Sequence, residues 1–169
     1  MGNKIFIGLG SNLGLCSNNL QNAIAAITAH KGLHLVQSSR VYQTEPQGFK
    51  NQPWFLNQVI HLKVEGFWTP WSLLTLLKGI EKKMGRKKRA GQGPRVIDLD
   101  ILVFRDRVID EADICIPHAS MKQRAFVLVP LMDICPDFVF PDGQSLKSIL
   151  GNINFTLEEN RIFQQYQNS

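Results

Sequence analysis

The sequence has 169 residues, 44% of them hydrophobic and 20% charged, a size and composition that predict one compact domain over residues 1–169. The formal net charge is +5, and no apolar run approaches the roughly 20 residues that cross a bilayer, so we expect no contact with a membrane. The three cysteines are scattered without a C-x-x-C pair, as is typical of reduced thiols in a cytoplasmic protein.

The N-terminal part of the chain predicts a strand, a helix and two further strands. Residues 4–8 are a short apolar run of strand length, and apolar residues at helical spacing predict a helix over 19–30. Residues 33–42 and 56–64 have the composition of strands. The segment 43–54 between them contains two prolines and a glycine and is predicted to be a long loop.

The following part predicts a helix, a strand and another helix. Thr69 and Pro70 suit the N-cap and first position of a helix that ends near residue 84. Residues 96–104 form the best-defined strand in the sequence. Residues 121–134 have the apolar body of a helix, which Pro130 is expected to kink or break.

This order of elements predicts an α+β sandwich, with helices on one face of a single, mainly antiparallel sheet. A short strand is expected at residues 138–140. The polar tail from about residue 152 carries no further signal. Neither an internal repeat nor a domain boundary is visible.

Two aspartates in the strand over 96–104 form the strongest candidate site. Strand alternation places Asp98 and Asp100 on one face. The apolar residues expected on the other face are Ile97, Leu99, Ile101 and Val103. Two carboxylates in a largely buried strand repel each other and lose hydration, and a divalent cation removes both penalties. On a solvent-exposed strand face the same pair would need no metal, so this alternative stays open.

A cationic segment lies just before these aspartates. Seven of the nineteen basic residues fall between positions 82 and 95, with no acid among them. Arg86, Arg89 and Arg95 are expected to hold phosphate oxygens through paired N–H groups. A metal-bound polyanion such as a nucleotide triphosphate would satisfy both charge clusters. The glycine-rich stretch 85–94 is predicted to be a mobile loop, although a merely solvated surface loop is the alternative.

The chain resembles the 6-hydroxymethyl-7,8-dihydropterin pyrophosphokinases of folate synthesis. The most specific match is Gly-Pro-Arg at 93–95 followed by Asp-Leu-Asp at 98–100. Further matching segments lie along the chain at 10–13, 44–48, 52–57, 85–86, 117–118, 121–126 and 140–143. The resemblance implies a ferredoxin-like α+β fold. It also implies transfer of diphosphate from MgATP to the pterin hydroxymethyl group, with release of AMP.

The resemblance also implies the roles of individual residues. Asp98 and Asp100 would hold two Mg²⁺ ions on the triphosphate, and Arg86 and Arg95 would neutralise the transferring phosphates. The implied pterin-binding residues are Thr44, Gln47, Gly48, Phe55, Asn57 and Phe126. The implied ATP-binding residues are Lys78, Arg86, Arg89, Arg95, Ile101, His118 and Arg124.

Two other functions stay open. An RNA-binding module also suits a ferredoxin-like sheet with a basic loop, but no RNP-like aromatic run is visible, and the two aspartates would repel phosphate without metal. A metal-dependent phosphohydrolase would use the aspartates equally well, but it leaves Phe55, Asn57 and Phe126 without a purpose. We therefore expect ATP and the hydroxymethyl pterin as partners, no nucleic acid, and a monomer.

Overall fold

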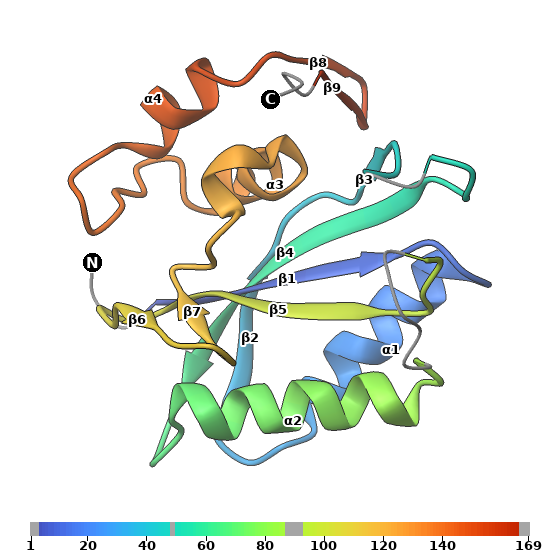
Figure 1. Ribbon diagram of the computed structural model, residues 1–169. Helices are drawn as coiled ribbons and strands as arrows, with labels where there is room; N and C mark the ends of the chain where they lie inside the picture. The colour runs from blue at the N-terminus through green and yellow to red at the C-terminus, as the bar shows by residue number, and fades with distance from the viewer. Residues whose placement is uncertain (1–3, 48–49, 87–92, 166–169) are drawn as a thin grey trace.

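The computed structural model describes residues 4–47, 50–86 and 93–165. A sheet lies between two helical layers, one formed by α1 (Cys16–Thr28) and α2 (Pro70–Lys83), the other by α3 (Ala125–Ile134) and α4 (Leu146–Gly151) (Figure 1). Over the described ranges, no helix is both long and apolar enough to cross a membrane.

The sheet is mainly antiparallel. Its strands are β1 (Ile5–Ser11), β2 (Leu33–Ser38), β3 (Tyr42–Thr44), β4 (Phe55–Val64), β5 (Asp98–Phe104), β8 (Phe155–Glu158) and β9 (Arg161–Gln164). Their order is β5-β1-β4-β3-β9-β8, with β2 also paired to β4, and β3 with β9 is the parallel pair. A separate ribbon joins β6 (Ile109–Asp110) to β7 (Cys115–Ile116). The predicted α+β sandwich is thus confirmed.

The prediction that helices cover one face of the sheet is wrong, because they cover both. Ile5 and Ile7 of β1 belong to the core that contains α1 and α2, while Phe6 between them belongs to the core that contains α3 and α4. Successive residues of a strand point to opposite faces, so an unbroken apolar run needs cover on each side. The run at the start of the chain therefore already indicated the second layer.

The start of α2 follows the predicted capping. The Thr69 side chain accepts a hydrogen bond from the Ser72 N–H at 3.1 Å, and the Ser72 hydroxyl accepts one from the Thr69 N–H at 2.9 Å. Pro70 is the first helical residue, where its missing N–H has no cost. This helix packs against β5, so the inward-facing side chains of α2 lie next to the edge strand of the sheet.

The predicted alternation in β5 holds for the aspartates and then fails. Asp98 and Asp100 lie on the face toward α3, opposite Leu99 and Ile101. The pairing with β1 then shifts by one residue at Leu102, the signature of a β-bulge. In consequence Val103 joins the core beneath α3, rather than the face of Ile101 where it was expected.

Several predicted boundaries also move. The single strand expected over 33–42 is two strands, β2 and β3, because the Ser39 side chain takes the place of a backbone acceptor for the Val59 N–H at 3.0 Å. The helix expected from 121 begins as a 3-10 turn, Met121–Gln123, and α3 then continues through Pro130. The strand expected at 138–140 is reduced to an isolated bridge.

Candidate functional site

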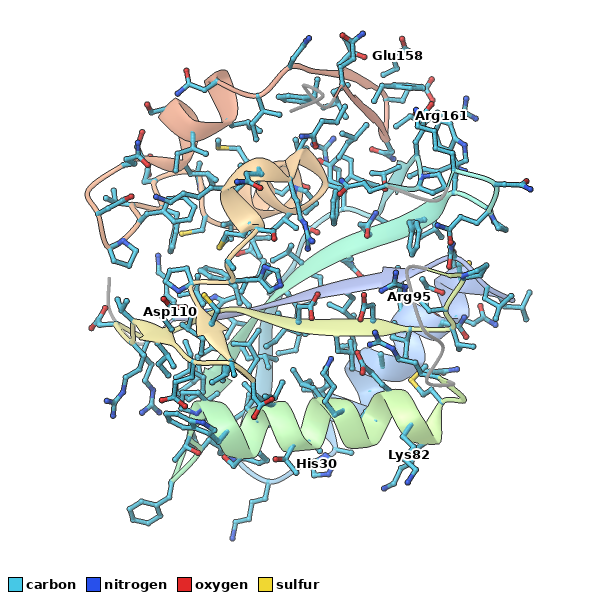
Figure 2. The ribbon with its side chains drawn as sticks, viewed as in Figure 1. His30, Lys82, Arg95, Asp110, Glu158 and Arg161 are labelled. Carbon is cyan, nitrogen blue, oxygen red and sulfur yellow. The ribbon has the colours of Figure 1, made fainter. Side chains whose placement is uncertain are left out.

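A cavity lies between the sheet and the first turn of α3, over the face of β5 that carries the aspartates. Nine of the predicted site residues line it: Thr44, Gln47, Phe55, Asn57, Arg95, Asp98, Asp100, Arg124 and Phe126. Figure 2 labels Arg95 beside the beginning of β5. The fold thus joins the predicted pterin-binding and phosphate-binding groups in one hollow.

The end of the cavity near β3 and β4 is an aromatic and amide pocket. The buried Asn57 donates from Nδ2 to the Thr44 hydroxyl at 2.6 Å, which fixes the orientation of its amide. A side chain at Gly10 would place its Cβ only 3.1 Å from Asn57 Oδ1, so glycine leaves room for that amide. The rings of Phe55 and Phe126 line the same space.

Each of these rings lies close to an arginine. The Arg95 guanidinium carbon is 5.6 Å from the ring centroid of Phe55, and the Arg124 carbon is 5.6 Å from that of Phe126. Cations at this separation are attracted to the ring face. The aromatic end of the cavity therefore passes directly into its cationic end.

Asp98 lies between two arginines. Its Oδ1 accepts from Arg86 Nη1, and its Oδ2 accepts from Arg95 Nη1 at 2.6 Å. Burial alone would raise the pKa of Asp98, but the charges of Arg86 and Arg95 outweigh burial and hold this pKa below its usual value. Asp98 is therefore a stable carboxylate even without a metal.

Asp100 has the opposite environment. Burial raises the pKa of Asp100, and the negative charge of Asp98 raises it further. Among the described residues, no side chain forms an ion pair with Asp100. A cation between the two carboxylates would remove this penalty.

The donor set fits Mg²⁺ bound together with a phosphate ligand. The described part of the chain contains no group of three or more His, Cys, Asp or Glu placed to hold a metal by itself. Mg²⁺ is commonly bound by one or two carboxylates, with substrate phosphates and water completing its shell. Asp98 and Asp100 match that pattern.

Glu81 is a site residue that the sequence analysis missed. Its carboxylate, on α2, is buried and accepts from the Leu99 N–H at 2.7 Å, from Lys78 Nζ at 3.2 Å and from Arg86. Burial raises the pKa of Glu81 despite these partners. The sequence did contain a signal for Glu81, because it is an acid at an inward-facing position of an otherwise apolar helix face.

Asn12, also missed, joins the turn after β1 to two walls of the cavity. Its side chain is 2% exposed. Oδ1 accepts from the Arg95 N–H at 2.8 Å, while Nδ2 donates to Gln52 and to the Pro53 carbonyl, each at 3.0 Å. The family-like Gly-Ser-Asn turn therefore fixes the backbone that presents Arg95.

The remaining predicted ATP-binding residues lie around the cationic end or beyond it. Lys78 and Arg86 both pair with Glu81 and also reach β5 directly, Lys78 at the Leu99 carbonyl at 3.5 Å and Arg86 at Asp98. The Ile101 side chain is in the core beneath β5, on the face away from the cavity. His118 lines a second hollow, where its Nδ1 accepts from the Ser120 N–H at 3.3 Å.

His118 still interacts electrostatically with the site. Burial lowers its pKa, and the neighbouring charges of Asp100 and Arg124 act on it in opposite directions. Two predicted residues, Gly48 and Arg89, lie outside the described residues, as does most of the expected mobile loop.

Comparison with known proteins shows the family. The family model described as 7,8-dihydro-6-hydroxymethylpterin-pyrophosphokinase matches residues 6–136. The chain is 36% identical over 151 residues to the 2-amino-4-hydroxy-6-hydroxymethyldihydropteridine pyrophosphokinase of Methylorubrum extorquens, an alignment covering 89% of this chain and 94% of the relative. It is 40% identical over 140 residues to the folic acid synthesis protein fol1 of Schizosaccharomyces pombe, covering 82% of this chain and 19% of that one.

A solved structure shares the fold. The wild-type HPPK-DHPS of Plasmodium falciparum with pteroate superimposes with a TM-score of 0.70 at 14% identity. The match covers 95% of this chain and 47% of the Plasmodium chain, so the chain corresponds to about half of that larger protein.

Proposed function

The chain belongs to the 7,8-dihydro-6-hydroxymethylpterin-pyrophosphokinase family and transfers diphosphate from ATP to hydroxymethyldihydropterin in folate biosynthesis, and we propose that both substrates meet in the cavity between β5 and α3. The observation that carries this proposal is the shared lining. An aromatic pair with a fixed amide and a carboxylate pair with arginines open onto the same space. A pterin and a triphosphate need those two kinds of surface.

The pterin occupies the aromatic end. Phe55 and Phe126 supply the faces between which a planar ring stacks, while Asn57 supplies an amide for the polar ring edge. The hydrogen bond to Thr44 holds this amide before the substrate arrives. Such preorganisation reduces the ordering cost of binding.

The triphosphate occupies the cationic end. Asp98 and Asp100 would hold two Mg²⁺ ions, which would supply charge neutralisation to the phosphate oxygens. Arg86 and Arg95 pair with Asp98 in the ligand-free chain. With MgATP bound, Asp98 would serve the metal, and the guanidinium groups of Arg86 and Arg95 would be available to phosphate oxygens.

Transfer forms one P–O bond and breaks another. The pterin hydroxyl oxygen bonds to the β-phosphorus, the bond from that phosphorus to the oxygen bridging the α-phosphorus breaks, and AMP leaves with the bridging oxygen. The hydroxyl proton is released as the new bond forms. The chain's own contribution is alignment of the hydroxyl and stabilisation of phosphate charge by Arg86 and Arg95.

The setting of the reaction is also proposed. Cys16, Cys115 and Cys135 form no disulfide, which supports a reducing compartment such as the cytoplasm. A monomer is part of the proposal, since this chain itself supplies the aromatic, amide, carboxylate and arginine groups that the reaction needs. The aspartates within the cationic end disfavour nucleic acid as the ligand.

Product analysis tests the function. The chain is incubated with MgATP and 6-hydroxymethyl-7,8-dihydropterin, and the products are identified by mass spectrometry. We expect AMP and diphosphorylated pterin in equal amounts, with neither formed when pterin is omitted. Phosphate release that does not depend on pterin would support a phosphohydrolase instead.

A further inference from the structure

The C-terminal hairpin of β8 and β9 lies beside the pterin end of the cavity although it is outside the segment that defines the family. The family model matches residues 6–136, whereas the hairpin spans 155–164. In Figure 1 it lies at the top of the molecule, next to β3 and above α3. It contacts three segments that carry lining residues of the pocket.

The first contact extends the sheet. β9 pairs in parallel with β3, placing Ile162 opposite Thr44, the residue that holds the Asn57 amide. Ile162 is 2% exposed and packs with Tyr42, Ala125 and Val129. The hairpin is therefore fastened to both β3 and α3.

The second contact holds the start of α3. The Gln164 side chain accepts from the Ala125 N–H at 2.8 Å and donates from Nε2 to the Gln123 carbonyl at 2.7 Å. These two backbone groups flank Arg124, whose own side chain does not cap the helix. Gln164 is thus hydrogen-bonded to the backbone on both sides of Arg124, just before Phe126.

The third contact supports the opposite wall. The rings of Phe163 and Trp54 meet edge to face, with centroids 5.5 Å apart and planes at 80°. Trp54 directly precedes Phe55 in the chain. The strand β9 therefore contacts both the segment that carries Phe126 and the segment that carries Phe55.

From these contacts we propose that the hairpin is a positioning element of the pterin pocket and that Gln164 is a positioning residue, setting the place of Phe126 opposite Phe55. The proposal rests on the function proposed above, since it concerns binding of the pterin substrate. It assigns to Gln164 no contact with either substrate. Its effect passes through the first turn of α3.

The test compares three full-length variants by steady-state kinetics with MgATP saturating. Gln164→Met keeps the length of the side chain and removes both hydrogen bonds, whereas Gln164→Glu keeps the acceptor for the Ala125 N–H. Gln165→Met is the matched control, because among the described residues the neighbouring Gln165 is seen to bond only to Asn154, at the base of the hairpin.

We expect Gln164→Met to raise the KM for pterin about tenfold, the effect of losing about 1.4 kcal/mol of positioning. The KM for MgATP should change by less than about threefold, and Gln165→Met should match the unsubstituted chain. Gln164→Glu should recover only part of the loss, because its second carboxylate oxygen meets the Gln123 carbonyl, to which the amide donated. Unfolding alone lowers kcat through the active fraction and leaves KM in place, so KM separates positioning from stability.

An unchanged pterin KM in Gln164→Met, whatever its melting temperature, would overturn the proposal, as would an equal rise in Gln165→Met. If Gln164→Met does not fold, Phe163→Leu replaces it, with an expected rise in pterin KM of about threefold and the same result overturning the proposal. Product formation by the unsubstituted chain is measured separately, so failure of the proposed function cannot be mistaken for failure of this inference.

Discussion

At the scale of single residues, Asp98 and Asp100 share a strand face but differ in electrostatic environment. Asp98 is paired with Arg86 and Arg95, whereas burial and the charge of Asp98 raise the pKa of Asp100. The expectation that both carboxylates weaken the metal-free protein therefore applies to Asp100 alone. The two positions form a natural pair of test substitutions.

We predict that both Asp98→Asn and Asp100→Asn reduce transfer at least about a hundredfold. Without metal, Asp98→Asn should destabilise the fold by about 1–3 kcal/mol because the charged partner of Arg95 and one of the two charged partners of Arg86 are lost. Asp100→Asn should raise the melting temperature, because the fold disfavours the charged form of Asp100 at neutral pH. Calorimetry with a chelator measures both, and shifts of the same sign would contradict the assignment.

The pterin end makes a separate prediction at Phe126. Phe126→Ala should weaken pterin binding by about 1–3 kcal/mol, the size of a lost base–aromatic stack, with ATP affinity changed far less. Titration calorimetry with each ligand alone measures the two affinities. Equal losses for both ligands would mean that Phe126 serves the core instead.

Glu81 predicts an effect on turnover without direct contact to substrate. Glu81→Gln retains an acceptor for the Leu99 N–H but loses the charge that orients Arg86, so kcat should fall about tenfold. Glu65→Gln is the matched control, since Glu65 pairs with Lys63 on the surface. An unchanged kcat in Glu81→Gln, or an equal fall in the control, would rule out this role.

At the scale of elements, α3 is tied to β3 through Asp133. Its carboxylate accepts hydrogen bonds from the fully buried Tyr42 hydroxyl at 2.9 and 3.0 Å and from Arg40. Burial and Asp133 together raise the pKa of Tyr42 to about 12, so the phenol stays a donor at all ordinary pH values. This contact holds the far end of the helix that carries Phe126.

Asp133→Asn is therefore predicted to destabilise the chain by about 1–2 kcal/mol at pH 7. Burial raises the pKa of Asp133, but hydrogen bonds from Arg40 and Tyr42 lower it more, leaving it below 3.8. A carboxylate whose pKa is lower in the folded than in the unfolded chain stabilises the fold at pH values above its unfolded pKa. This stabilisation is lost as the pH falls through the folded pKa. Urea unfolding from pH 7 to 3 should show the difference shrinking below about pH 4, and a growing difference would contradict this.

The helices and strands also show which structural features can be predicted from the sequence. The Thr69 cap, the α2 stripe and the shared face of Asp98 and Asp100 follow from local rules, and all were predicted. The bulge at Leu102 was not, because it depends on the fit between β5 and β1. The strand β9 was not predicted either, because it lies in a polar stretch and pairs in parallel with β3, more than a hundred residues earlier in the chain.

At the scale of the whole molecule, the proposed site is supported by the sheet and by the helical layers on both of its faces. α2 brings Glu81 and Lys78 to β5 from one side, and α3 brings Arg124 and Phe126 from the other. The sequence analysis named Lys78, Arg124 and Phe126 as candidate ligand-binding residues but not the residues that support them. Glu81 and Asn12 were missed because a buried polar side chain is recognised by its partners, which are distant in the chain.

The most direct measurement follows the phosphorus atoms of ATP. The chain is incubated with the hydroxymethyl pterin, Mg²⁺ and ATP labelled either at the β- or at the γ-phosphorus. The account predicts that both labels pass to the pterin in equal amounts and that the AMP formed contains neither, because the β-phosphorus is attacked and the terminal diphosphate moves as a unit. Transfer of the γ label alone, or release of either label as free phosphate at the rate of ATP consumption, would contradict it.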